Sequence, residues 1–149
     1  MIGSTGQKES SGDIDLAVDA NLISKDALIE VLLKYCEANN FPKPCIKKTG
    51  NSVHLLTPIN GDPKNGYVQT DFMFLHDMAY SKWIYGAMPS ASQFKGVDRA
   101  VLINSIGKAV RQLPDGTPAP QGVKIDVNAG LKNRQTDDLI TTNPNEIAH

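Results

Sequence analysis

Polar and apolar residues alternate from residue 13 to residue 18, where the chain reads Asp-Ile-Asp-Leu-Ala-Val. A period of two predicts a β-strand with one face in the core. On such a strand Ile14, Leu16 and Val18 enter the core, whereas Asp13 and Asp15 share the opposite face. The pattern therefore predicts two neighbouring carboxylates on the polar side of a strand.

A helical pattern follows the predicted strand. Ser24 is a suitable N-cap for a helix over residues 25–39, because its hydroxyl can accept a hydrogen bond from a free backbone N–H of the first turn. Asn39, Asn40 and Pro42 then end the helix. Its apolar stripe has helical spacing and consists of Ala27, Leu28, Val31, Leu32 and Tyr35.

Three further extended segments are predicted. Residues 45–48 and 52–57 are short extended runs, and the turn-forming sequence Thr-Gly-Asn at residues 49–51 joins them. The sequence NGDPKNG at residues 60–66 is rich in turn-forming residues. Residues 67–75 are then rich in β-formers, with Asp71 in the middle. These runs predict an antiparallel meander with a carboxylate on its last strand.

The second half of the chain gives weaker signals. A short helix or turn is expected over residues 77–86, and Gly96 precedes a second helix over residues 97–112. Residues 114–120 form a Pro-rich loop, and residues 123–127 are expected to form a short strand. The chain from Asn133 onward is polar enough to predict a frayed tail. We therefore expect one domain over residues 1–113, followed by a loop, a short strand and a polar tail over residues 114–149.

Composition narrows the class of protein. The chain has 149 residues, enough for one domain with a real core. Its formal net charge of -1 gives no overall attraction to nucleic acid or to anionic membranes. Cys36 and Cys45 form no CxxC motif, so we expect packed, reduced thiols and no zinc site. With no long apolar run and no signal-peptide pattern, a cytoplasmic location without membrane association is expected.

Candidate chemistry lies in three features in sequence order: Gly3-Ser4, Asp13 with Asp15, and Asp71. Carboxylates at positions i and i+2 of a strand project together and can share Mg²⁺ or Mn²⁺, which prefer oxygen ligands. Gly3 permits close backbone approach, and Ser4 with neighbouring N–H groups can hold phosphate. Asp71 is the expected third carboxylate, and Asp126, in the sequence VKIDV, is the alternative.

The Gly-Ser pair, eight intervening residues and the sequence DIDLAVD resemble the signature of the DNA polymerase beta-like nucleotidyltransferase superfamily. The resemblance implies an α+β fold, with a small mixed sheet flanked by helices, that here lacks the usual first helix and strand. It further implies a catalytic domain over residues 1–113 that uses two metal ions, with Asp13, Asp15 and Asp71 as catalytic metal ligands. Gly3 and Ser4 would bind the nucleoside triphosphate, with ATP as one such substrate. Lys8, in the same loop, is a further candidate phosphate ligand.

The resemblance implies transfer of a nucleoside monophosphate from a nucleoside triphosphate to a hydroxyl acceptor, with release of pyrophosphate. The acceptor is open among an RNA or tRNA end, a protein and a small molecule. Two alternatives remain: a nucleotide-binding or regulatory domain without turnover, and a Mg²⁺-dependent phosphohydrolase. Structural roles are expected for His54 and His76, and core packing for Tyr80, Trp83 and Tyr85.

Overall fold

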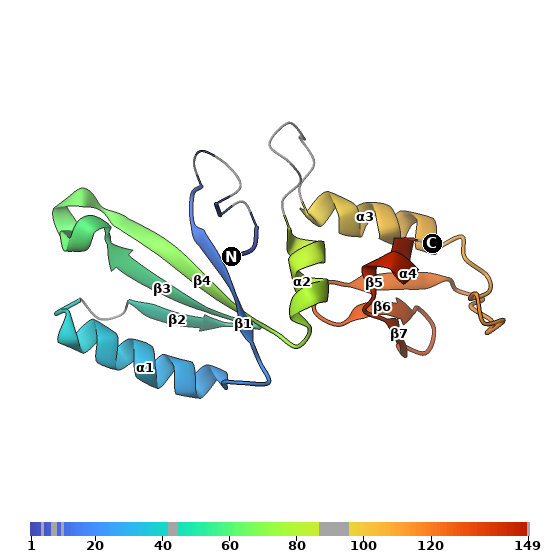
Figure 1. Ribbon diagram of the computed structural model, residues 1–149, viewed down its shortest axis with the longest axis horizontal. Coiled ribbons are helices and arrows are strands. Elements are labelled where there is room, and N and C mark those ends of the chain that lie inside the picture. Colours follow the sequence, from blue (N-terminus) through green and yellow to red (C-terminus); the bar gives the residue numbers. More distant parts are fainter. Residues whose placement is uncertain (4, 7–8, 10, 42–44, 87–95, 149) are drawn as a thin grey trace. The chain divides into compact units, whose positions relative to one another are not determined.

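The computed structural model describes residues 1–148 except residues 4, 7–8, 10, 42–44 and 87–95 (Figure 1). The chain forms two compact units, Met1–His76 and Asp77–His149. Each unit combines helices with a sheet, so the fold class is α+β, as the sequence predicts. None of the helices in the described ranges is long and apolar enough to cross a membrane.

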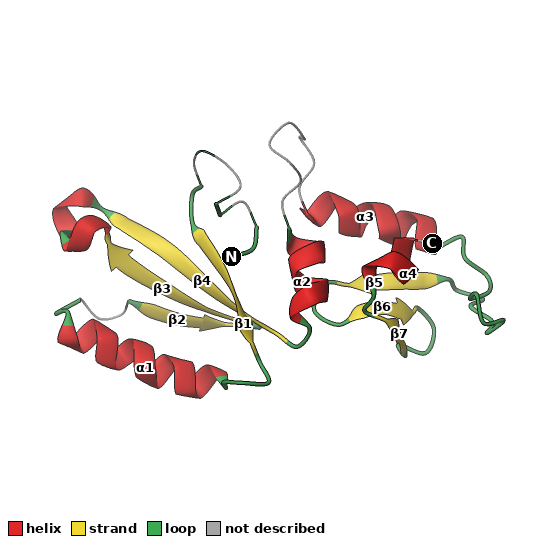
Figure 2. Ribbon diagram, viewed as in Figure 1, coloured by secondary structure: helices red, strands yellow, loops and turns green. Residues whose placement is uncertain are grey.

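The first unit is a four-stranded mixed sheet with one long helix (Figure 2). Its strand order is β1-β4-β3-β2. Strand β1 runs parallel to β4, and the β4–β3 and β3–β2 pairs are antiparallel. The elements are β1 (Ile14–Asp19), α1 (Lys25–Ala38), β2 (Ile46–Thr49), β3 (Ser52–Pro58), the 3-10 turns η1 (Ile59–Gly61) and η2 (Pro63–Asn65), and β4 (Tyr67–Leu75). The predicted strands, first helix and meander are thus confirmed.

Helix α1 packs on one face of this sheet. The Ser24 side chain caps the helix by accepting a hydrogen bond from the backbone N–H of Ala27, at 3.2 Å. From the helix, Leu32 and Cys36 pack in one core cluster with Cys45, just before β2, and with the buried strand residues Val53, Leu55 and Phe74. Because side chains alternate along a strand, the residues between these core positions project from the other face of the sheet. That second face carries the candidate chemistry.

The second unit is a smaller sheet with three helices in its described part. The antiparallel sheet has the order β5-β6-β7. Its core cluster contains Tyr80, Ile84, Ala100 and Ile125. The elements are α2 (Met78–Tyr85), α3 (Gly96–Gly107), β5 (Val123–Asp126), β6 (Gly130–Asn133), β7 (Leu139–Thr141) and α4 (Pro144–Ala148).

The C-terminal region is more ordered than the sequence predicts. The expected frayed tail after Asn133 is wrong, because β7 and α4 lie within it. The Asn133 side chain is buried and accepts hydrogen bonds from the backbone N–H groups of Gln135 and Thr136. These bonds shape the turn that follows β6. Polar side chains here satisfy backbone groups, which a reading of hydropathy alone does not reveal.

The division into units also differs from the expected boundary after residue 113. Helix α3, expected within the first domain, packs with β5 in the second unit. The Asn104 side-chain oxygen accepts a hydrogen bond from the backbone N–H of Ile125, at 2.9 Å. Helix α3 therefore covers the small C-terminal sheet.

Candidate metal centre

Parallel pairing of β1 and β4 brings three carboxylates together. Asp15 lies directly opposite Asp71 in the register of the two strands, and Asp13 lies two residues before Asp15. One carboxylate oxygen of each residue can be chosen so that all three lie within 4.8 Å of one another. All three residues are partly buried. These three residues, called the acidic cluster below, are the ones that the sequence predicted as metal ligands.

The three carboxylates of the acidic cluster repel one another when no cation is bound. Burial raises the pKa of the Asp15 carboxyl above its ordinary value, and the nearby carboxylates of Asp13 and Asp71 raise it further. Within the described residues, neither Asp13 nor Asp15 forms an ion pair with a lysine or arginine. Converging oxygen donors that lack a cationic side chain suit a hard divalent cation such as Mg²⁺. The acidic cluster could therefore hold a metal ion.

The N-terminal segment, described here by Ile2, Gly3 and Thr5, is hydrogen-bonded to the backbone of Asp15 in the acidic cluster. The Ile2 N–H donates a hydrogen bond to the Asp15 carbonyl at 3.0 Å, and the Asp15 N–H donates to the Thr5 hydroxyl at 2.9 Å. Gly3 has a φ of +63°, and a Cβ at this position would lie 2.3 Å from Oδ2 of Asp15. Only glycine fits this position without a shift. The predicted phosphate ligands Ser4 and Lys8 lie outside the described residues.

Two neighbouring side chains orient the Asp71 carboxylate. Oδ1 of Asp71 lies 2.6 Å from Nδ1 of His54 and accepts a hydrogen bond from Nε2 of Gln69 at 2.8 Å. With Nδ1 protonated, the imidazole donates to the same oxygen. Both of these bonds within the described residues use Oδ1, so Oδ2 can accept another ligand. The His54 and Asp71 side chains are 24% and 16% exposed, so solvent competes only partly for this contact.

Sequence reasoning gave His54 a structural role and did not consider Gln69. The available signal was strand register. In an antiparallel β3–β4 pair, His54 lies directly opposite Asp71, and Gln69 precedes Asp71 by two residues on the same face. Recognising this contact required knowing which residues of β3 and β4 face one another. That register depends on the turn at residues 59–66, and a turn-rich sequence does not determine it.

Asp126, the alternative third carboxylate, belongs to the second unit. Its carboxylate accepts hydrogen bonds from the backbone N–H groups of Asn128 and Ala129, and Lys132 lies 3.6 Å away. Asp126 thus shapes the turn between β5 and β6. Nearby, the buried Tyr80 hydroxyl donates to the Asp126 carbonyl at 2.6 Å, which confirms the expected core role of Tyr80.

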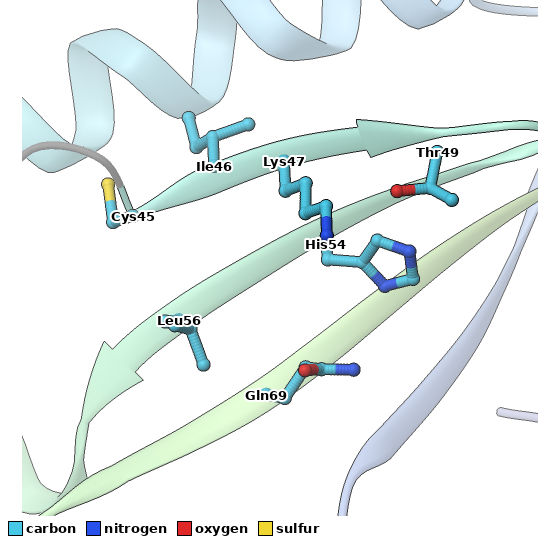
Figure 3. A pocket seen from close by; sticks show the side chains of 7 residues that line it. All are labelled: Cys45, Ile46, Lys47, Thr49, His54, Leu56 and Gln69. Atoms are coloured by element: carbon cyan, nitrogen blue, oxygen red, sulfur yellow. The ribbon is translucent and has the colours of Figure 1, made fainter.

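A groove lies beside the acidic cluster on the same face of the first sheet. It has a volume of about 500 Å³. Figure 3 shows side chains from three neighbouring strands around it. His54 and Gln69, which hold Asp71, also line the groove. The other lining residues are Cys45, Ile46, Lys47, Thr49 and Leu56.

Comparison of the chain with protein-family models, with curated proteins and with solved structures found no match. The functional proposal therefore rests on the geometry of the first unit.

Proposed function

We propose that this protein is a metal-dependent nucleotidyltransferase. It would move a nucleoside monophosphate from a nucleoside triphosphate to a hydroxyl on an RNA or tRNA end, a protein or a small molecule, and release pyrophosphate. The observation that supports this proposal is the meeting of Asp13, Asp15 and Asp71 within 4.8 Å of one another, beside a glycine that packs on Asp15.

Asp13, Asp15 and Asp71 would hold Mg²⁺ or Mn²⁺. Bound there, the cation would neutralise charge on the triphosphate and lower the pKa of an attacking hydroxyl. Asp13 and Asp15 lie on the side of the N-terminal segment, where Gly3 permits backbone to approach the cluster closely. Asp71 lies on the side of the groove, and its orientation is set by His54 and Gln69.

Labelled nucleotides test the proposal directly. The protein is incubated with each α-³²P-labelled nucleoside triphosphate, Mg²⁺ and a mixture of RNA, protein and small-molecule acceptors. We expect label to pass to one class of acceptor, and an Asp13→Asn, Asp15→Asn double variant to lose at least a hundredfold in rate. Glu30→Gln, an exposed carboxylate on α1, is the matched control and should transfer label at the unmodified rate.

Two other outcomes would replace the proposal. Release of unlabelled phosphate or of free nucleoside monophosphate, with no acceptor labelled, would indicate a phosphohydrolase that uses the same carboxylates on water. Saturable binding of the nucleotide without turnover would indicate a nucleotide-binding domain.

A further inference from the structure

The groove and the N-terminal segment lie on different sides of the acidic cluster. In the sheet order β1-β4-β3-β2, the N-terminal segment is bonded to β1, whereas the groove is lined by β2, β3 and β4. The acidic cluster, formed by Asp13 just before β1, Asp15 on β1 and Asp71 on β4, lies between them. His54 and Gln69 each touch Asp71 and line the groove, so the groove adjoins the acidic cluster.

The geometry of phosphoryl transfer gives the two sides of the acidic cluster different roles. In an in-line displacement the attacking oxygen and the leaving oxygen lie on opposite sides of the phosphorus. If the N-terminal segment holds the leaving pyrophosphate, the attacking hydroxyl approaches from the opposite side of the acidic cluster. That side is the groove.

The groove has the size of a small-molecule site. Small-molecule pockets are commonly about 300–1,000 Å³, and the groove measures about 500 Å³. In the described part of the chain, its lining contains one ring, the imidazole of His54, and no Phe, Tyr or Trp. These described lining residues therefore offer no aromatic platform on which a nucleobase would stack. Thr49, His54 and Gln69 instead supply hydrogen-bonding groups that suit hydroxyls.

Charge adds one further requirement on the ligand. Lys47 is exposed, and among the described lining residues it is the one with a permanent positive charge; none of these described residues is a carboxylate. Within the described residues Lys47 forms no ion pair, whereas its neighbour Lys48 points to the other face and bonds Asp26 on α1 at 2.7 Å. An unpaired ammonium group in a groove whose described lining contains no carboxylate favours a ligand with an anionic group.

We propose that this groove is the acceptor subsite and that the acceptor is a small polyhydroxylated molecule with one phosphate group. This inference rests on the proposed function. Lys47 binds the phosphate group, and Thr49 and Gln69 bind hydroxyls. One acceptor hydroxyl oxygen bonds to the α-phosphorus of the nucleotide, the bond from that phosphorus to the bridging oxygen breaks, pyrophosphate leaves with the electron pair, and the hydroxyl proton goes to water.

The binding part is tested by amide NMR on the 149-residue protein with ribose 5-phosphate and ribose as probes. Ribose 5-phosphate should shift the amide signals of Lys47, Thr49 and Gln69 in a saturable manner, with at least tenfold higher affinity than ribose. Lys47→Ala should remove this preference for phosphate, and Lys48→Ala, on the same strand, should retain it. Absence of shifts in the groove, or equal preference for phosphate in the Lys47→Ala variant, would overturn the inference.

The catalytic part is tested by label transfer from α-³²P-labelled nucleoside triphosphates to a panel of sugar phosphates, the matching free sugars and RNA oligonucleotides. Transfer of label to a sugar phosphate would support the inference if Lys47→Ala also raises the KM for that acceptor at least tenfold. Preferential transfer to RNA would overturn the inference and leave the proposed function standing. Binding in the groove without transfer to any acceptor would contradict the proposed function itself.

Discussion

The Asp71 carboxylate uses one oxygen, Oδ1, for both His54 and Gln69. Groups that orient a metal ligand commonly change metal affinity by about 10–100-fold when removed. We therefore expect His54→Ala to weaken Mg²⁺ binding by about tenfold, measured by calorimetric titration. His76→Ala, which alters an exposed histidine just after β4, should leave the affinity unchanged. Equal Mg²⁺ affinity in both variants would show that His54 does not orient Asp71.

Gly3 has no room for a side chain. Its φ is left-handed, and an alanine Cβ at this position would lie 2.3 Å from Oδ2 of Asp15, so Gly3→Ala must move either the N-terminal segment or the carboxylate. We expect at least a tenfold loss of nucleotide affinity in the presence of Mg²⁺, measured with a fluorescent nucleoside triphosphate. Gly12→Ala is the matched control, because its Cβ would meet no atom within 4 Å. Unchanged affinity in the Gly3→Ala variant would argue against a phosphate-binding role for this segment.

Asp15 destabilises the metal-free protein when it is ionised. Because its folded pKa is raised, the folded state favours the protonated carboxyl, and this contribution is lost as pH rises through the folded pKa. At neutral pH without metal, Asp15→Asn should therefore stabilise the fold, by on the order of 0.5 kcal/mol, since solvent screens partly exposed charges. Urea unfolding in a chelator measures this change. Added Mg²⁺ should reverse the ranking, and a variant that is less stable in chelator would contradict the account.

Helix α1 and the residue that precedes β2 contribute two buried, free thiols that lie side by side. The Sγ atoms of Cys36 and Cys45 lie 2.7 Å apart in the core of the first unit. Burial, with a further contribution from the Cys45 thiol, raises the pKa of Cys36 to about 11. A raised thiol pKa stabilises the fold below the unfolded value of about 8.5, and this contribution is lost as pH rises toward the folded pKa.

Thiol alkylation should therefore be slow in the folded protein. We expect iodoacetamide at pH 8 to modify Cys36 and Cys45 at least a hundredfold more slowly than in urea, because both thiols are buried in the folded protein and the raised pKa of Cys36 disfavours its reactive thiolate. The free energy of unfolding should also fall between pH 9 and pH 11. Rapid alkylation without denaturant would show that these thiols are exposed, contrary to the buried positions of both residues.

The elements of the first unit followed from local sequence. Alternation in residues 13–18 and the Ser24 cap identified β1 and α1, because one face of each is apolar and the helix has a side-chain cap. The strands β6 and β7 could not be identified in this way. They are four and three residues long, and their turns are built from side-chain bonds of polar residues such as Asp126 and Asn133. Such bonds depend on partners that hydropathy does not reveal.

For the molecule as a whole, the acidic cluster was predictable and its surroundings were not. A net charge of -1 gave no indication of a charged site, yet three carboxylates meet on one sheet. The residue types and their order along the chain predicted that Asp13, Asp15 and Asp71 form one site. The groove and the His54 contact depend on the register of β2, β3 and β4, and the predicted meander did not specify which residues face one another across these strands. The separation into two units likewise depends on which sheet α3 covers.

Product analysis tests the central proposal most directly. The protein is supplied with Mg²⁺, one α-³²P-labelled nucleoside triphosphate and the best acceptor, and pyrophosphate and labelled acceptor are measured in the same reaction. The account predicts one pyrophosphate for each labelled acceptor, with both products absent in the Asp13→Asn, Asp15→Asn variant. Orthophosphate or free nucleoside monophosphate in place of these products, or the same yield from the variant, would contradict it.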